Sequence, residues 1–239
     1  MPKRIILLML ITMALCWKAD GLCAQDVCEM GFYGGTNKAK LEERFFDYDN
    51  RWGGQVGFDA KVGAKWVQVE MSLGYLNAGT KYTLNSRVGL NENSMHQEQT
   101  FKYKSSAHYV DIPVSLALGW WEMEDSGFGL TVSGGAYMSV GLAGKIKVKG
   151  DFKSHDESGF LYESFSKDYS TKLFGDEPFQ YKRFDAGWTV GARLALGEVF
   201  RVAVSYRQGL VNLSNVDGYK ATNRMLMIGV VFAIPGDDY

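Results

Sequence analysis

The sequence has few of the residues that cross-link a chain or bind a metal. It contains three cysteines, four prolines and three histidines among 239 residues, and its formal net charge is −1. A near-neutral chain lacks the basic field that a nucleic-acid-binding domain needs. The histidines have no metal-ligand spacing, either with one another or with a cysteine. We therefore expect no nucleic-acid partner, no metal centre and no cofactor.

The N-terminal region lacks an apolar run long enough for a membrane-spanning helix. Residues 5–17 are apolar, but a spanning helix needs roughly 20 such residues. Lys3 and Arg4 precede this run and the small residue Ala24 follows it, an order typical of a secretory signal peptide. We predict that residues 1–24 are cleaved and that residues 25–239 form one domain. Cys28 then remains alone, so the exported fold is expected to hold without an internal disulfide.

What the chain does contain is alternation with a period of two. In residues 106–121, Val110, Ile112 and Val114 share one side of a predicted strand, whereas Asp111 and Ser115 share the other. The stretch is longer than an ordinary globular strand of about 5–6 residues. A membrane-crossing β-strand needs about ten tilted residues. This length favours an outer-membrane barrel over a soluble enzyme.

Eight strands are predicted, and the connections between them alternate between long and short. The predicted strands lie at 30–36, 51–63, 67–75, 106–121, 128–142, 184–196, 200–207 and 225–232. The two longest connections are 77–105 and 150–183. Before the second one, the alternation of Lys145, Lys147 and Lys149 with apolar residues indicates a strand that continues into water. Short periplasmic turns and longer extracellular loops are typical of outer-membrane barrels. The predicted fold is therefore all-β, an eight-stranded antiparallel up-and-down transmembrane β-barrel.

Aromatic residues on the apolar side gather at both ends of the predicted strands. This pattern indicates two interfacial girdles around an aliphatic band. The predicted membrane-interface aromatics are Trp52, Tyr75, Trp120, Phe128, Phe184, Phe200 and Phe232.

Charged residues share the opposite side of the same strands. In a membrane barrel this side faces the lumen, which in an eight-stranded barrel is just wide enough for side chains to fill. We expect a structural ion-pair network there, with a gate or narrow small-solute pore as an alternative. The predicted lumen residues are Asp59, Lys61, Glu70, Asp111, Arg193, Arg201 and Arg207. In a second alternative, a soluble periplasmic lipocalin-like barrel, the apolar side lines a ligand cavity instead.

Pro113 lies within a predicted strand of a closed sheet. Proline cannot donate a hydrogen bond to the sheet ladder. We therefore predict a β-bulge at Pro113, with the proline ring pointing into the lumen.

One hexapeptide resembles a known family. Residues 109–114, Tyr-Val-Asp-Ile-Pro-Val, resemble the Tyr-x-(Glu/Asp)-Ile-Pro strand of the PorT-like outer-membrane β-barrel family of Bacteroidetes, small barrels of the OmpA/OmpX type. The resemblance implies an outer-membrane location, surrounding outer-membrane lipid and insertion by the barrel-assembly machinery. It carries no catalytic residues. Members include a secretion-system component, so an accessory role in secretion is a further alternative.

No catalytic site is predicted. Ser106 and His108 lie on the lipid-facing side near the loop end, but no motif supplies a third member. We expect a structural or surface-interaction role, in which an extracellular protein or glycan binds the aromatic and charged loops at 77–105 and 150–183.

Overall fold

The computed structural model describes residues 27–43, 49–64, 66–89, 96–123, 128–155, 161–177 and 180–235. The predicted signal at residues 1–24 lies outside the described residues. Within them, no helix is long and apolar enough to cross a membrane. The ten strands are β1 (Val27–Glu43), β2 (Asp49–Gly63), β3 (Val67–Ala78), β4 (Thr80–Gly89), β5 (His96–Met123), β6 (Phe128–His155), β7 (Leu161–Lys172), β8 (Phe184–Leu196), β9 (Phe200–Gly209) and β10 (Ala221–Pro235).

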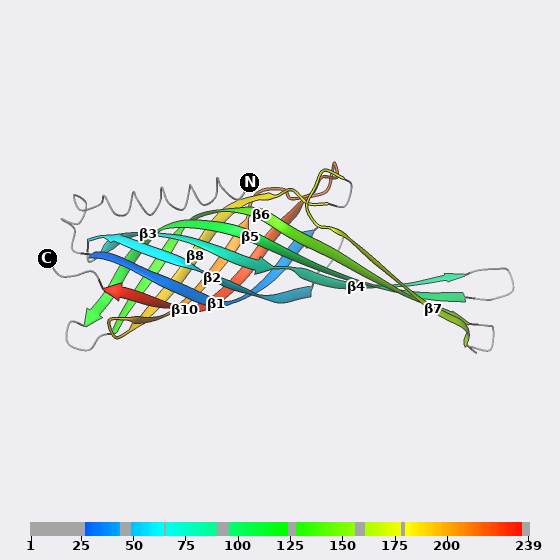
Figure 1. The fold of residues 1–239 in the computed structure, drawn as a ribbon, viewed down its shortest axis with the longest axis horizontal. Coiled ribbons are helices and arrows are strands. Elements are labelled where there is room, and N and C mark those ends of the chain that lie inside the picture. The colour runs from blue at the N-terminus through cyan, green and yellow to red at the C-terminus, as the bar shows by residue number, and fades with distance from the viewer. Residues whose placement is uncertain are drawn as a thin grey trace.

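Eight of these strands close into a ring, which confirms the predicted barrel (Figure 1). Every neighbouring pair is antiparallel, in the order β1, β2, β3, β5, β6, β8, β9, β10. The ring closes between β1 and β10, which stay in register from Glu29 opposite Pro235 to Glu43 opposite Ala221. A closed ring leaves no strand with unpaired backbone groups, the condition for a β-structure to span lipid.

The barrel carries its apolar side chains outside and its polar ones inside. On the outer face Phe58 is 52% exposed and Leu116 is 53% exposed, whereas Asp111 and Tyr137 on the inner face are both 1% exposed. This orientation is the reverse of the predicted lipocalin-like alternative, in which apolar side chains would line a ligand cavity. The alternation predicted from the sequence therefore separates a lipid-facing surface from a polar lumen.

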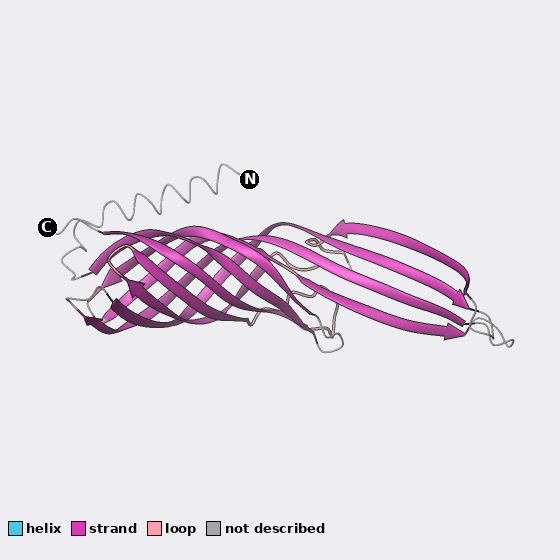
Figure 2. Ribbon diagram, turned by 90° about the horizontal axis from the view of Figure 1, so that it is seen from below, coloured by secondary structure: helices cyan, strands magenta, loops and turns pink. Residues whose placement is uncertain are grey.

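The two predicted long loops, 77–105 and 150–183, consist largely of strand. Short connections join β2 to β3, β5 to β6 and β8 to β9 at one end of the barrel, which we call the short-turn end. β5 and β6 each have 28 residues and remain paired from this end to His96 opposite His155. β4 pairs with the far part of β5, and β7 with the far part of β6. The result is a four-stranded sheet that projects beyond the barrel (Figure 2). We call it the extension, comprising residues 80–89, 96–106, 145–155 and 161–172.

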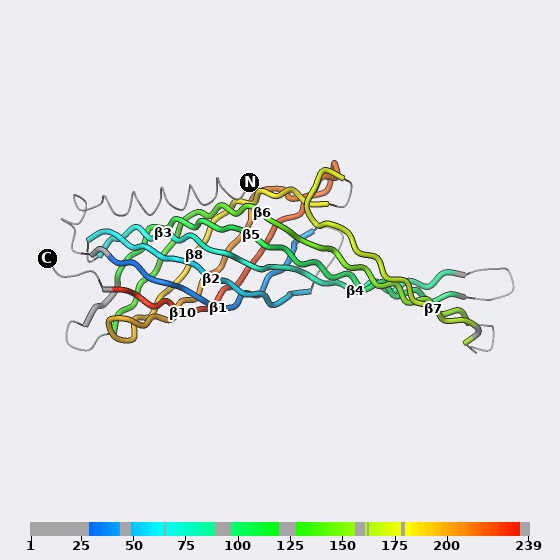
Figure 3. Tube along the Cα trace, viewed as in Figure 1, coloured from blue at the N-terminus to red at the C-terminus, as the bar shows by residue number. Residues whose placement is uncertain are grey.

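The predicted continuation of a strand through Lys145, Lys147 and Lys149 is confirmed by β6, but the rest of this sheet was predicted as loop because its alternation is of a different kind. Along the extension, aromatic residues alternate with lysine, serine and threonine, and both faces carry exposed side chains. A search for aliphatic residues alternating with small ones does not find such strands. Figure 3 shows the traces of β5 and β6 running continuously from the barrel into the extension.

A β-bulge marks the passage from barrel to extension. His108 lies opposite Ala143 and Tyr109 lies opposite Gly141, so Leu142 is an extra residue in β6. One extra residue reverses which side chains of a strand face outward. Val140 before the bulge and Lys145 after it are both exposed, whereas Ile146 is only 3% exposed. The bulge thus keeps the lysines of β6 on the outer face.

The predicted bulge at Pro113 is wrong. Pro113 lies in regular register opposite Tyr137 of β6. On the other side of β5, Met71 of β3 lies opposite Val114 and Gly74 lies opposite Asp111, so the register is the same before and after the proline. The two positions between these pairs are not paired. The missing N–H is thus accommodated by a short gap in the ladder rather than by an added residue. Pro113 does line the central lumen cavity, as expected.

Glycines make room inside the barrel for one large polar side chain, Tyr33 of β1. A Cβ added to Gly74 would lie 1.9 Å from the Tyr33 hydroxyl oxygen, and one added to Gly57 would lie 2.7 Å from the Tyr33 ring. By contrast, the nearest atom to a Cβ on Gly134 is 3.9 Å away. The position of the Tyr33 side chain therefore requires glycine at Gly57 of β2 and Gly74 of β3.

We predict that Gly74→Ala destabilises the barrel by about 1–3 kcal/mol, because the added methyl displaces Tyr33 from a packed interior. Urea unfolding followed by gel mobility of unheated samples measures the loss. Gly134→Ala serves as the matched control and should leave the midpoint unchanged. Adding Tyr33→Phe to Gly74→Ala should restore part of the loss, and no recovery would contradict the proposed clash.

Candidate functional site

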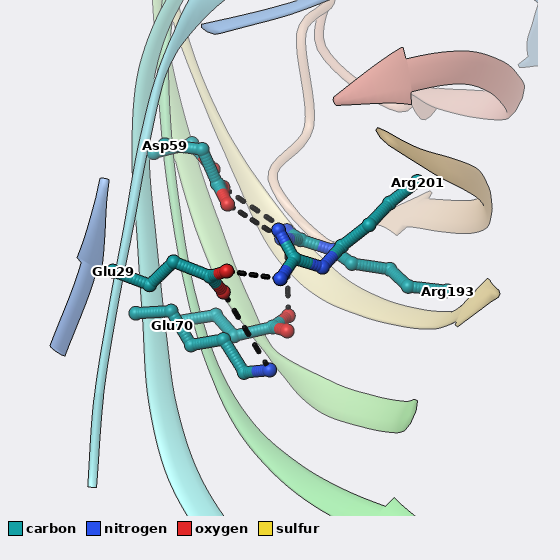
Figure 4. A network of polar contacts seen from close by, with 7 residues as sticks. Glu29, Asp59, Glu70, Arg193 and Arg201 are labelled. Carbon is teal, nitrogen blue, oxygen red and sulfur yellow. Dashed lines mark hydrogen bonds and ion pairs between the residues drawn. The ribbon is translucent and has the colours of Figure 1, made fainter. Parts of the chain in front are cut away.

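The centre of the lumen holds an ion-pair network built from strands on opposite walls (Figure 4). Arg193 of β8 donates two hydrogen bonds to Asp59 of β2, at 2.5 and 3.0 Å. The same guanidinium lies 3.4 Å from a carboxylate oxygen of Glu70 on β3. Ser72 donates a hydrogen bond of 2.6 Å to Asp59. Two carboxylates thus share one arginine across the barrel.

A second group of charges lies toward the short-turn end. Arg201 of β9 donates a hydrogen bond to Glu29 of β1, and Lys61 of β2 lies 3.9 Å from the same carboxylate. Figure 4 shows Glu29 and Glu70 on one wall and the two arginines, Arg193 and Arg201, reaching toward them from the other.

A third group lies nearer the extension. Arg207 of β9 donates a hydrogen bond of 2.6 Å to Asp111 of β5, which also accepts one of 2.7 Å from Ser139. The Arg207 guanidinium stacks 5.2 Å from the centre of the Tyr137 ring. Tyr137 in turn donates a 3.2 Å hydrogen bond to the buried carboxylate of Asp185. Buried charges of this kind persist only where they are paired and hydrogen-bonded.

Between these groups lies a cavity of about 90 Å³, lined by charged and hydroxyl side chains that include Tyr33, Asp59, Glu70 and Arg193. The volume equals roughly three water molecules at liquid density. The space is too small and too polar for the apolar ligand of a lipocalin-like barrel.

The lumen is closed toward the extension by an apolar plug. Leu173 and Phe174, in the segment after β7, are 3% and 4% exposed. They pack inside the mouth against a cluster that includes Tyr109, Ile146 and Met225. The Phe174 and Tyr109 rings meet edge to face, with centroids 5.6 Å apart.

All seven predicted lumen residues lie on the inner face of the barrel. The structure joins Asp59 and Glu70 with Arg193, joins Asp111 with Arg207, and brings Lys61 and Arg201 to one shared carboxylate. That carboxylate, Glu29, and the buried Tyr137 were not predicted as members of the network. Both were detectable by position, since Glu29 precedes the outward-facing Met30, and Tyr137 precedes the outward-facing Met138.

The predicted interfacial aromatics occupy the two ends of the outer face. Trp52, Tyr75 and Phe184 are 58%, 41% and 47% exposed at the end toward the extension. Phe128 and Phe232 are 55% and 50% exposed at the short-turn end, where the Phe200 and Phe232 rings meet at 5.6 Å. The side chain of Trp120 lies outside the described residues.

Ser106 and His108 are neighbours on the outer face, where both contact the side-chain amide of Asn77. The His108 ring nitrogen Nδ1 contacts the Tyr75 hydroxyl and lies 3.1 Å from the Asn77 amide. The Ser106 hydroxyl accepts a long hydrogen bond from the same amide. Within the described part of the chain, no carboxylate orients the histidine and no cluster of metal ligands occurs. The group instead holds Tyr75 at the edge of the apolar band.

The inner face of the extension, continuous with the lumen side, is aromatic. Phe101 packs edge to face with Phe152 at 5.5 Å, and Phe152 stacks on Phe165 at 4.7 Å. Nearer the barrel, Tyr82 and Tyr103 meet at 5.0 Å. Burial is the main cause that raises the pKa of both tyrosines, so their hydroxyls stay protonated at neutral pH.

The outer face of the extension is rich in lysine. Lys102 donates a 3.2 Å hydrogen bond to Asp151, and Lys149 lies 3.8 Å from the same carboxylate. The Lys102 hydrogen bond is the main cause that holds the pKa of Asp151 below its usual range. A lowered carboxyl pKa contributes stability above the unfolded value near pH 4, and the contribution disappears as the pH falls through the lowered pKa.

Comparison with known proteins gives one family match. Residues 23–215 match the family model described as "Outer membrane protein beta-barrel domain". No curated protein sequence matches the chain.

Solved structures resemble the chain weakly, at identities of 13–14%. The attachment invasion locus protein Ail of Yersinia pestis, solved with the heparin analogue sucrose octasulfate, has a TM-score of 0.38 and 14% identity over 87% of this chain and 99% of its own. Neisserial surface protein A has a TM-score of 0.39 and 13% identity over 85% and 96% of the two chains. The outer membrane protein OprG of Pseudomonas aeruginosa scores 0.40 with 13% identity over 89% and 98%.

We predict that Arg207→Met destabilises the barrel by about 3–5 kcal/mol, because it leaves the Asp111 carboxylate buried without a counter-charge. Urea titration of the folded barrel measures the loss. Lys102→Met removes a cation from the exposed pair with Asp151 and serves as the control, with no measurable change expected. The double variant Asp111→Leu/Arg207→Met should recover most of the stability, and equal losses in the single and double variants would contradict this interpretation.

Proposed function

The chain belongs to the outer membrane protein beta-barrel domain family, and on this basis we propose that its barrel anchors a recognition sheet at the cell surface. The protein is an integral outer-membrane barrel, with an apolar outer band and a polar lumen. Because short turns face the periplasm in such barrels, the extension lies on the extracellular side.

The observation that carries the proposal is the extension itself. β5 and β6 continue well past the ring of eight strands, and β4 and β7 pair along their outer edges. Ordering a residue of backbone costs about 1–2 kcal/mol. The ring closes without β4 and β7, so the four-stranded sheet is not needed to complete the barrel, and an external contact is the role that explains it.

The inner face of the extension supplies the contact chemistry. Leu84, Phe165 and Tyr169 are 43%, 46% and 63% exposed. They lie on one face with Phe101 and Phe152, whose rings meet edge to face. Exposed aromatic rings on a rigid sheet suit the binding of an extracellular protein or glycan, because few rotatable bonds must be fixed.

We also propose three finer assignments. Residues 1–24 act as a cleaved export signal, and the barrel-assembly machinery inserts the mature chain into outer-membrane lipid. The hexapeptide at 109–114 supports a place among PorT-like barrels of Bacteroidetes. The arrangement of Ser106 and His108 on Asn77 supports a role without catalysis.

We predict that shortening the extension abolishes surface binding while the barrel persists. Residues 84–101 and 150–167 are each replaced by a two-residue turn, which retains the plug at Leu173 and Phe174. Whole cells that display the full chain or the shortened one are compared on panels of host-surface proteins and glycans. The variant Phe101→Ser/Phe165→Ser should lose the same ligands. Equal binding by full and shortened chains would refute the recognition role, provided that surface levels match.

A narrow pore is the second candidate, and the salt bridges and the apolar plug both oppose it. We predict that the purified chain gives no ion conductance in planar bilayers, because the Phe174 plug and the Arg193 network obstruct the lumen. A variant that lacks residues 173–176 and carries Arg193→Ala should give measurable current. Steady single-channel current from the unaltered chain would instead establish the pore.

A further inference from the structure

We propose that the outer face of the extension, beside the membrane, binds the phosphate groups of outer-leaflet glycolipids. The proposal rests on an arrangement of lysines that the recognition role of the inner face does not use. It holds whether or not an extracellular partner binds that inner face.

Lysines lie directly opposite one another across adjacent strands of this face. Side chains that are opposite in register share a face and approach to about 5 Å at their Cβ atoms. Like charges in these positions destabilise a sheet. The opposed pairs are Lys81 with Lys104, Lys104 with Lys147, Lys102 with Lys149, and Lys145 with Lys172.

Four of these lysines lack a compensating charge. Among the described residues, Asp151 takes up Lys102 and Lys149, but no ion pair reaches Lys104, Lys145, Lys147 or Lys172. All four are exposed. A doubly charged anion between opposed ammonium groups would turn the repulsion into attraction.

The lysines lie next to the apolar band rather than at the tip of the extension. Lys145 follows Leu142, the last exposed large apolar residue of β6, by three residues, or about 10 Å of strand. From the edge of the barrel to the level of Asp151, the outer face carries seven lysines against three carboxylates, those of Asp49, Asp151 and Asp168. Those seven are Lys81, Lys102, Lys104, Lys145, Lys147, Lys149 and Lys172.

Closer to the tip the charges nearly balance. There Arg87 and Lys153 share the outer face with Glu98, which lies opposite both of them. A ligand in free solution would have no preference for the end beside the membrane. The concentration of positive charge at headgroup depth favours a lipid phosphate over a distant soluble polyanion.

The bulge at Leu142 supports the same assignment. Without the extra residue, Lys145, Lys147 and Lys149 would face the inner side and Ile146 and Val148 would face the lipid side. The bulge thus places the lysines on the same face as the lipid-facing side of the barrel, next to the end of the aliphatic band that adjoins the extension.

The test compares two double variants that each remove two positive charges from the outer face. Lys104→Gln/Lys147→Gln acts beside the membrane, and Arg87→Gln/Lys153→Gln acts near the tip. The full-length mature chain in neutral detergent is titrated with bisphosphorylated lipid A, and native mass spectrometry counts the bound lipid. At about fivefold for each lysine, the first variant should bind about 25-fold more weakly. The second should stay within about twofold of the unaltered chain.

Two further ligands separate the sources of the anion. Removing the phosphates from lipid A should weaken its binding to the unaltered chain. The loss should be as large as that caused by the Lys104→Gln/Lys147→Gln variant with phosphorylated lipid A. Soluble tripolyphosphate should bind poorly to all three proteins. The proposal is wrong if both double variants lose affinity equally, if phosphate removal has no effect, or if tripolyphosphate alone depends on Lys104 and Lys147. Should that variant fail to give a folded band, Lys145→Gln/Lys172→Gln repeats the comparison at the neighbouring opposed pair.

Discussion

The structure depends on the closure of one hydrogen-bond ladder, that between β1 and β10. Lipid offers no partners for backbone N–H and C=O groups, so a sheet in a membrane must have no edge. Fifteen residue pairs in continuous register meet this condition. Once the ring is closed, the alternation of each strand assigns every side chain to lipid or to lumen. The aliphatic band, the aromatic girdles and the buried charges all follow from that assignment.

The extension obeys a different rule, because water can satisfy its edges. β4 and β7 therefore end the sheet without closing it. The single extra residue at Leu142 lies between the barrel part and the extension part of β6. Because of it, lysines in the extension share the outer face with the aliphatic residues of the barrel. A shift of one residue in register thus lets β5 and β6 present aliphatic side chains to hydrocarbon in the barrel and charged side chains to water in the extension.

The ring could be predicted from the sequence because each barrel strand must repeat the same contrast between an aliphatic side and a polar side. Residues 184–196, for example, were located without error. The extension could not be predicted in the same way, because Phe101 and Lys102 alternate between two water-exposed faces and give no aliphatic contrast. Partners within the lumen were also beyond prediction. Periodicity shows that Asp59 and Arg193 face inward, but their pairing across the barrel depends on strand tilt and shear.

The distribution of the lumen charges along the chain bears on how the barrel assembles. Glu29, Asp59, Glu70 and Asp111 come from the first four ring strands, and Arg193, Arg201 and Arg207 come from β8 and β9. Each half of the ring carries an excess of one charge sign in its interior, because Lys61 offsets only one of the four carboxylates and Asp185 only one of the three arginines. A half-built sheet would leave most of that excess unpaired, which is costly in hydrocarbon. Charge complementarity between the two halves therefore favours the complete barrel over a partial one.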